Sequence, residues 1–118
     1  VQYADKKVSV NPLGEMRLRD QYPHIFQVAN LAISASRVVV QPGGAIGLKS
    51  HSGRPGITYV IDGIMLEHRS DADRPLLRRP GDVSLTNNNI SNWWENTSAE
   101  PAILFVWGIA DCGECRNE

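Results

Sequence analysis

The stretch GGAIGLKSHSGRPGITYVIDG, from Gly43 to Gly63, decides the fold of this chain. Short runs rich in β-branched and aromatic residues alternate in it with glycine and proline, and each run has the length of one strand. Gln41-Pro-Gly-Gly44, Ser52-Gly-Arg-Pro-Gly56 and Asp62-Gly63 provide turn residues between the runs. The stretch therefore predicts antiparallel strands, with a hairpin at Asp62-Gly63 as the clearest turn.

The same alternation continues over most of the chain. Apolar residues do not keep a helical spacing in any window, so we expect at most one short helix, within the first thirty residues. Predicted strands cover Phe26–Ile33, Arg37–Gln41, Ile46–His51, Ile57–Asp62, Ile64–Arg69, Asp82–Thr86, Asn92–Asn96 and Ile103–Ile109. Short strands with closely spaced turns are typical of an all-β sandwich or barrel.

Two of these strands are apolar on both faces. The runs Ile57–Ile61 and Ile103–Trp107 contain few polar residues, whereas a strand with one wet face alternates. A second apolar layer must cover each of them. We expect the opposite sheet on one side and a second copy of the chain on the other, which predicts a homodimer.

Length and charge limit the classes of function. The 118 residues suffice for one domain. Within it we expect an N-terminal arm with the first strands at 1–36, a barrel at 37–110 and a polar tail at 111–118. A net charge of -1 from 12 basic and 13 acidic residues offers no basic face for nucleic acid. The longest apolar stretch, Ala102–Ala110, is too short to span a membrane. Because the chain starts at Val1, both an exported and a cytoplasmic location stay open.

The spacing of glycine and polar residues in two segments resembles that of the small single-domain cupins, a family of jelly-roll type barrels with two antiparallel sheets. The first cupin motif has glycine, five residues, His-x-His, three or four residues, Glu, six residues and glycine. Gly43, Lys49-Ser50-His51, Gly56 and Gly63 keep every gap of that motif. The second motif matches at Gly81, Asn87-Asn-Asn89, Asn92 and Asn96. The resemblance covers about residues 37–109 and implies a cupin barrel.

The metal-ligand positions of that family are largely substituted here. Metal-dependent cupins use both histidines and the glutamate of the first motif, and the histidine of the second. Those positions are Lys49, His51, Gly56 and Asn92, so His51 is the one candidate ligand left. A transition ion needs three or four donor atoms, and the ammonium group of Lys49 repels a cation. The resemblance thus implies neither a metal nor another cofactor.

The remaining histidines are not strong ligand candidates. His24 follows Pro23 and is expected to pack or to cap a turn. His68 stands between Glu67 and Arg69, and we expect this charged run to be a solvated strand end.

The polar residues of the two motifs predict a ligand pocket. Residues two apart on a strand share a face, so Lys49 and His51 point the same way. The resemblance implies that Lys49, His51 and Asn92 face the barrel interior as catalytic residues. The expected substrate-binding residues are Thr58, Val60, Trp94 and Asn96. An apolar pocket with a few convergent polar groups is typical of small-molecule sites.

Two chemistries are open to Lys49. If it stays protonated, its charge binds a carboxylate or stabilises an oxyanion while His51 moves a proton. If burial makes it neutral, it serves as a general base or a Schiff-base amine. A third interpretation is structural: the Lys49 amine reaches water at the barrel mouth, and His51 only hydrogen-bonds Asn92.

The leading hypothesis is a metal-independent enzyme that acts on a small organic acid or carbonyl compound by isomerase, cyclase or lyase chemistry. One alternative is a non-catalytic binding or sensor protein, and another is an atypical metal-dependent oxygenase or isomerase.

Cys112 and Cys115 form a CxxC pair for which we expect a local disulfide or two free thiols. The sequon at Asn96 falls inside the barrel motif, and we discount it as a glycosylation site.

Overall fold

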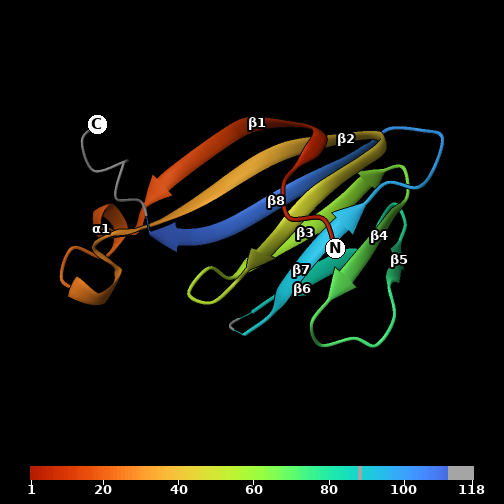
Figure 1. Cartoon of the computed structure of the whole chain (residues 1–118). Helices are drawn as coiled ribbons and strands as arrows, with labels where there is room; N and C mark the ends of the chain where they lie inside the picture. Colours follow the sequence, from red (N-terminus) through yellow and green to blue (C-terminus); the bar gives the residue numbers. More distant parts are fainter. Residues whose placement is uncertain (88, 112–118) are drawn as a thin grey trace.

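The computed structural model describes residues 1–87 and 89–111, and strands dominate this part of the chain (Figure 1). The strands are β1 (Lys6–Arg17), β2 (Leu31–Ser50), β3 (Gly56–Asp62), β4 (Met65–Arg69), β5 (Leu76–Arg78), β6 (Val83–Thr86), β7 (Ser91–Glu95) and β8 (Ala102–Asp111). A four-residue helix, α1 (Leu18–Gln21), and a 3-10 turn, η1 (Phe26–Val28), connect β1 to β2. Within the described residues, no helix is long and apolar enough to cross a membrane. Cys112 and Cys115 lie outside the described residues.

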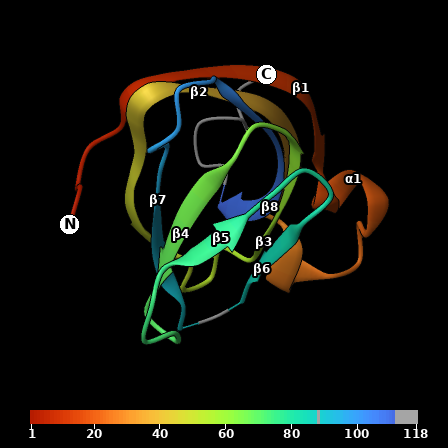
Figure 2. The same cartoon turned by 90° about the vertical axis from the view of Figure 1, so that its right-hand side faces the viewer.

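β2 is the strand that joins the two sheets. Its first half, up to Val40, pairs with β8 on one edge and with β1 on the other. After a bend at Pro42–Gly44, the segment Ala45–Ser50 pairs with β7. One layer therefore has the order β1-β2-β8-β3-β6, and the other has the order β2-β7-β4-β5, with every pairing antiparallel. Figure 2 shows the strands around a common interior, which confirms the predicted double-sheet barrel.

The hydrophobic core lies between the two layers. Alternation along β2, β3 and β8 sends every second side chain inward, as the strand period requires. The buried core residues are Val38, Val40, Val60, Met65, Trp94, Ala102 and Leu104. Because they come from both layers, the core fixes the spacing between the sheets.

The predicted hairpin at Asp62-Gly63 is wrong. β3 pairs with β6 and β8, whereas β4 pairs with β5 and β7, so the chain crosses from one layer to the other at this turn. Gly63 has φ +79°, and a Cβ there would lie 2.5 Å from the carbonyl oxygen of Pro101. The sequence thus identifies the turn but not the strands with which β3 and β4 pair, because pairing depends on residues far along the chain.

The first layer carries an apolar outer face. The register places Ile57 and Tyr59 of β3 beside Leu85 and Val83 of β6, with all four side chains pointing away from the core. Phe105 and Trp107 of β8 continue this surface with an edge-to-face ring contact at 5.8 Å. We call these residues the outer apolar face: Ile57, Tyr59, Val83, Leu85, Phe105 and Trp107. This outer apolar face agrees with the sequence, in which the segments of β3 and β8 are apolar on both faces.

Candidate functional site

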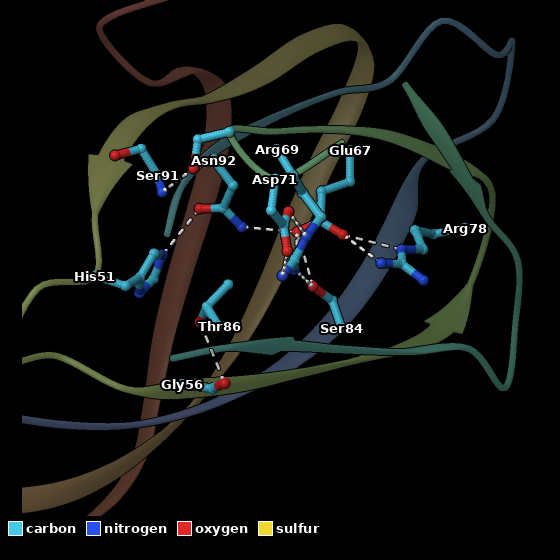
Figure 3. Close-up of polar contacts among 11 residues, drawn as sticks. His51, Gly56, Glu67, Arg69, Asp71, Arg78, Ser84, Thr86, Ser91 and Asn92 are labelled. Carbon is cyan, nitrogen blue, oxygen red and sulfur yellow. Dashed lines mark hydrogen bonds and ion pairs between the residues drawn. The ribbon is translucent and has the colours of Figure 1, made fainter. Parts of the chain in front are cut away.

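A fully buried carboxylate, Glu67 of β4, occupies the barrel interior (Figure 3). Its Oε1 accepts hydrogen bonds from Arg78, with Nε at 2.9 Å and Nη2 at 2.8 Å. Its Oε2 accepts from Ser84 Oγ at 2.7 Å, Asn92 Nδ2 at 2.8 Å and Arg69 Nη1 at 3.1 Å. We call Glu67 and these four donors the interior cluster. The expectation of a solvated strand end at Glu67 is therefore wrong.

Strand geometry explains how these charges come together. Met65, Glu67 and Arg69 alternate along β4, so they share its inward face. The donors come from β4 itself and from β5, β6 and β7, and because β6 belongs to the other layer, Glu67 bridges the two layers through the Oγ of Ser84. Buried charges are stable only when paired and hydrogen-bonded, and the cluster meets this condition.

The cluster keeps Glu67 ionised. Burial by itself raises the pKa of this carboxyl group, but the hydrogen bonds from Asn92, Ser84 and Arg78 and the charge of Arg78 outweigh it. The net pKa of Glu67 is lower than its ordinary 4.5. Arg69 is held in addition by Asp71, whose hydrogen bond is the main reason that the pKa of Arg69 is raised.

Asn92 connects the interior cluster to His51, as Figure 3 shows. Its Nδ2 donates to Glu67, and its Oδ1 lies 2.8 Å from His51 Nε2. The other ring nitrogen, His51 Nδ1, lies 3.0 Å from the carbonyl oxygen of Arg54. The structure thus brings together His51 and Asn92, two of the three predicted catalytic residues.

Lys49 lies at the barrel mouth rather than inside the barrel. Half of its side chain is exposed, and its Nζ lies 3.1 Å from Asp5 Oδ1. The register of β2 on β7 shifts between Ile46 and Lys49, which breaks the simple alternation used to predict its direction. Burial raises the pKa of Asp5, but the backbone N–H of Gly47 and the Lys49 amine lower it more.

A cavity of about 210 Å³ opens beside Lys49 and His51 at this end of the barrel. Its polar lining consists of Ser34, Ser36, Lys49, Ser50, His51 and Arg54. Val106 and Ile109 are among its apolar lining residues, and the described residues that line it include no carboxylate. A larger hollow of about 360 Å³ near Gly63 is lined by Asp62 and Glu100, and no basic side chain is among the described residues around it. Basic side chains and hydroxyls thus make up the polar part of the lining of the mouth cavity, and the Lys49 amine in it is paired with Asp5.

The four residues predicted to bind substrate do not line the mouth cavity. Val60 and Trp94 are buried in the core, and Thr58 faces the interior opposite Ser84. Asn96 is 1% exposed and donates to the carbonyl oxygens of Val40 and Glu100, so it holds a turn. Their role in ligand binding stays a prediction.

The described residues do not fit the metal site of the metal-dependent relatives. They contain no group of three or more His, Cys, Asp or Glu side chains that could hold an ion. Both nitrogens of His51 face other groups, and both oxygens of Glu67 are taken by donors. The guanidinium group of Arg69 within the cluster would also repel a cation.

His68 lies on the other side of β4. Its ring stacks on Trp93 with centroids 3.9 Å apart and hydrogen-bonds the carboxylate of Glu95. The His68 side chain is only partly exposed, so the solvated strand end predicted for this charged run holds for His68 only in part. Sequence reasoning missed the interior cluster, and the Glu-x-Arg spacing of Glu67 and Arg69 was the one local signal for a same-face ion pair.

Comparison with known proteins agrees with this geometry. A family model described as Cupin matches residues 16–109. A predicted oxalate decarboxylase of Thermotoga maritima is 22% identical, with TM-score 0.59 over 67% of this chain and 79% of its own. The Cnp3 cupin domain of Schizosaccharomyces pombe is 12% identical, with TM-score 0.70 over 95% and 71%. KdgF from Halomonas sp. is 12% identical, with TM-score 0.64 over 86% and 80%. No curated protein matched significantly.

Proposed function

Because the chain belongs to the cupin family, we propose that it uses the open end of the cupin barrel to bind a small organic acid without a metal ion, and that His51 moves a proton on the bound acid. The solved neighbours share the fold at low identity, so the substrate class is inferred from the cavity. This proposal rests on the lining of the mouth cavity. The lining contains Lys49, Arg54 and His51 and, among the described residues, no carboxylate. Cationic side chains and hydroxyls are the groups that bind carboxylates.

The cavity also sets the size of the ligand. Its volume of about 210 Å³ is smaller than that of drug-sized sites, which begin near about 300 Å³. A short-chain carboxylate or keto acid fits such a volume. Lys49 and Arg54 would hold the anionic group, and His51 would accept or donate the proton.

Binding can be tested by titration calorimetry with short-chain mono- and dicarboxylates, with the matching uncharged amides as control ligands. We expect the acids to bind and Lys49→Ala or Arg54→Ala to weaken binding about tenfold, since each removes a charge-assisted hydrogen bond. Arg79→Ala, an exposed arginine outside the cavity lining, is the matched control and should leave the affinity unchanged. Equal binding of acids and amides would refute an anion site.

Turnover separates an enzyme from a binding protein. Proton NMR of a bound acid in heavy water reports exchange of C–H hydrogens, which acid/base catalysis at carbon produces. We expect His51→Ala to abolish exchange while binding persists. Binding without exchange in the wild type would instead identify a sensor or carrier. Elemental analysis of protein purified without chelator completes the test, because a stoichiometric ion lost in His51→Ala would overturn metal independence.

A further inference from the structure

Gly108 of β8 belongs to an apolar wall of the mouth cavity. β8 contributes residues 106–110 to the lining, and none of them carries a charge or a hydroxyl group. Val106 packs against the core, so the alternation of a strand turns Gly108, two residues further on, toward the interior as well. The basic residues Lys49 and Arg54 come from the end of β2 and from the loop that follows it. The cavity thus combines charges from one part of the chain with an uncharged wall from another.

The strand register places Gly108 close to His51. Gly108 pairs with Ser34 of β2 and with Gly56 of β3, and residues directly opposite each other share a face of the sheet. Ser34 and Gly56 also line the cavity. A Cβ on residue 56 would lie 4.0 Å from Cε1 of His51, and Gly108 is one strand further away, which is about 4.8 Å. A group that rests on Gly108 therefore lies near the imidazole ring.

The backbone does not require glycine at position 108. Gly108 is not among the residues with positive φ, and a Cβ there would meet, within the described residues, only the carbonyl oxygen of Pro55 at an ordinary contact distance of 3.5 Å. A Cβ on Gly56, in contrast, would lie 3.2 Å from Oγ1 of Thr86 and would force a shift. Glycine weakens the interior of a strand and is typical of places where a ligand or another backbone approaches closely. Because no backbone comes unusually close to Gly108, its missing side chain leaves open space in the cavity.

We propose that Gly108 determines which acids the mouth cavity accepts, because the space above it holds an uncharged hydrocarbon segment of the ligand. This inference rests on the proposed function, in which Lys49 and Arg54 hold the carboxylate. The hydrocarbon segment then lies against Val106 and Gly108, beside His51. A second carboxylate on the ligand would meet the apolar wall of β8 without a partner, which is costly. The substrate class is therefore a monocarboxylic acid with a short, unbranched hydrocarbon chain.

NMR chemical-shift titrations with acetate, butyrate and succinate test the ligand class, with acetamide and butyramide as uncharged probes. We expect butyrate to bind about fifteenfold more tightly than acetate, because each of its two additional methylene groups contributes about fourfold when it leaves water. Succinate should bind more weakly than butyrate. Equal affinities for acetate and butyrate, or tighter binding of succinate, would overturn the proposal.

The amides separate this proposal from the proposed function. If butyramide binds as tightly as butyrate but more tightly than acetamide, the anion site is refuted and the hydrocarbon site at Gly108 stands. If acids bind better than amides without any effect of chain length, the anion site stands and the role of Gly108 is refuted. If neither acids nor amides bind, both proposals are refuted.

Gly108→Val should remove the preference for the longer chain, because its side chain fills the space that the hydrocarbon segment needs. We expect the affinities of this variant for acetate and butyrate to agree within about twofold, with acetate binding nearly as in the wild type. Gly14→Val makes the same replacement in the exposed strand β1, where a Cβ meets no atom within 4 Å, and should keep the full preference. A preference that is unchanged in Gly108→Val, or lost in both variants, would overturn the proposal.

Thermal unfolding of the ligand-free variants checks that the space at Gly108 is open. Gly108→Val should unfold at a temperature at least as high as the wild type, since valine suits a strand better than glycine. A marked decrease would show that the side chain meets other atoms and would contradict the open space. Gly108→Ala adds only the Cβ, so it should fold in either case and reduce the preference for butyrate in part.

Discussion

At the scale of single residues, Glu67 connects more of the interior than any other charged side chain described above. Four side chains from β4, β5, β6 and β7 donate to it, namely Arg69, Arg78, Ser84 and Asn92. A cluster of this kind contributes more to specificity of the arrangement than to net stability, because desolvation offsets the attraction. Removing one member is different, since it leaves unpaired charge behind.

Glu67→Gln should therefore be strongly destabilising at neutral pH. We expect its free energy of unfolding to fall by about 3–5 kcal/mol, the usual cost of breaking a buried ion pair. The lowered pKa of Glu67 means that its ionic contribution is complete above the ordinary value of 4.5 and is lost as pH falls through the folded-state value. Chemical denaturation measured across pH should show that the difference in free energy of unfolding between wild type and Glu67→Gln becomes smaller in acid. Glu100→Gln, at an exposed position, is the control. A stability difference between wild type and Glu67→Gln that does not change with pH would contradict a stabilising role for ionised Glu67.

Asp5 competes with any ligand for the amine of Lys49. Asp5→Asn should strengthen binding of a carboxylate by about two- to fivefold, because an exposed ion pair is worth about 0.2–1 kcal/mol. Calorimetry checks this against Asp73→Asn, which changes the net charge equally at an exposed position outside the cavity lining. If both variants bound the carboxylate more tightly by the same factor, the change in net charge alone would explain the effect.

The candidate site was only partly predictable at this scale. The cupin spacing indicated His51 and Asn92, and the structure joins them by a hydrogen bond. The position of Lys49 at the barrel mouth is one of the interpretations that the sequence leaves open, and the sequence could not choose among them because the position depends on a register shift in β2 and on Asp5, which is far away in sequence. Burial of Glu67 likewise depends on Arg78 and Ser84, whose approach only the folded barrel creates.

At the scale of elements, the segment before β1 lies along β2 near the cavity. Leu48 N donates to the carbonyl oxygen of Gln2 at 2.8 Å, and Gly47 N donates to Asp5 Oδ1 at 2.8 Å. A Cβ on residue 47 would come within 2.4 Å of the carbonyl oxygen of Tyr3. Glycine at this position is what lets the N-terminal segment approach β2.

Gly47→Ala should displace that segment while the barrel stays folded. We expect the amide of Leu48 to exchange its hydrogen about fivefold faster, since it loses a hydrogen bond worth about 1 kcal/mol. Hydrogen exchange followed by NMR measures this. Gly14→Ala is a suitable control, because a Cβ there meets no atom within 4 Å. Unchanged protection of Leu48 would show that the contact with the N-terminal segment is dispensable.

Most strands of the barrel could be predicted, but their continuity could not. The turn residues at 42–44 predict the end of a strand, whereas the structure bends β2 there and continues it, because pairing with β7 stabilises the second half. β1 was not predicted, since its residues are mostly exposed and lack an apolar alternation. It is held by hydrogen bonds to β2, which no local pattern reports. The short strand β5 was missed for the same reason.

At the scale of the whole molecule, the outer apolar face leaves large side chains in water. Leu85 is 62% exposed and Ile57 is 45% exposed, and such patches usually mark contact surfaces. We propose that a second copy of the chain covers this face, as the apolar strands led us to expect. Light scattering should then show a dimer that Leu85→Glu or Ile57→Glu converts to a monomer. Leu77→Glu, on β5 of the other layer, should remain dimeric. A monomeric wild type would refute the proposal.

The place of β8 has a consequence for biosynthesis. The strand made last among those described lies between β2 and β3, two strands made much earlier. A nascent chain leaving the ribosome therefore carries two unsatisfied strand edges until residue 111 has emerged, and unpaired edges invite association with other chains. Chaperone contact with the growing polypeptide should persist over the same interval and end when β8 inserts.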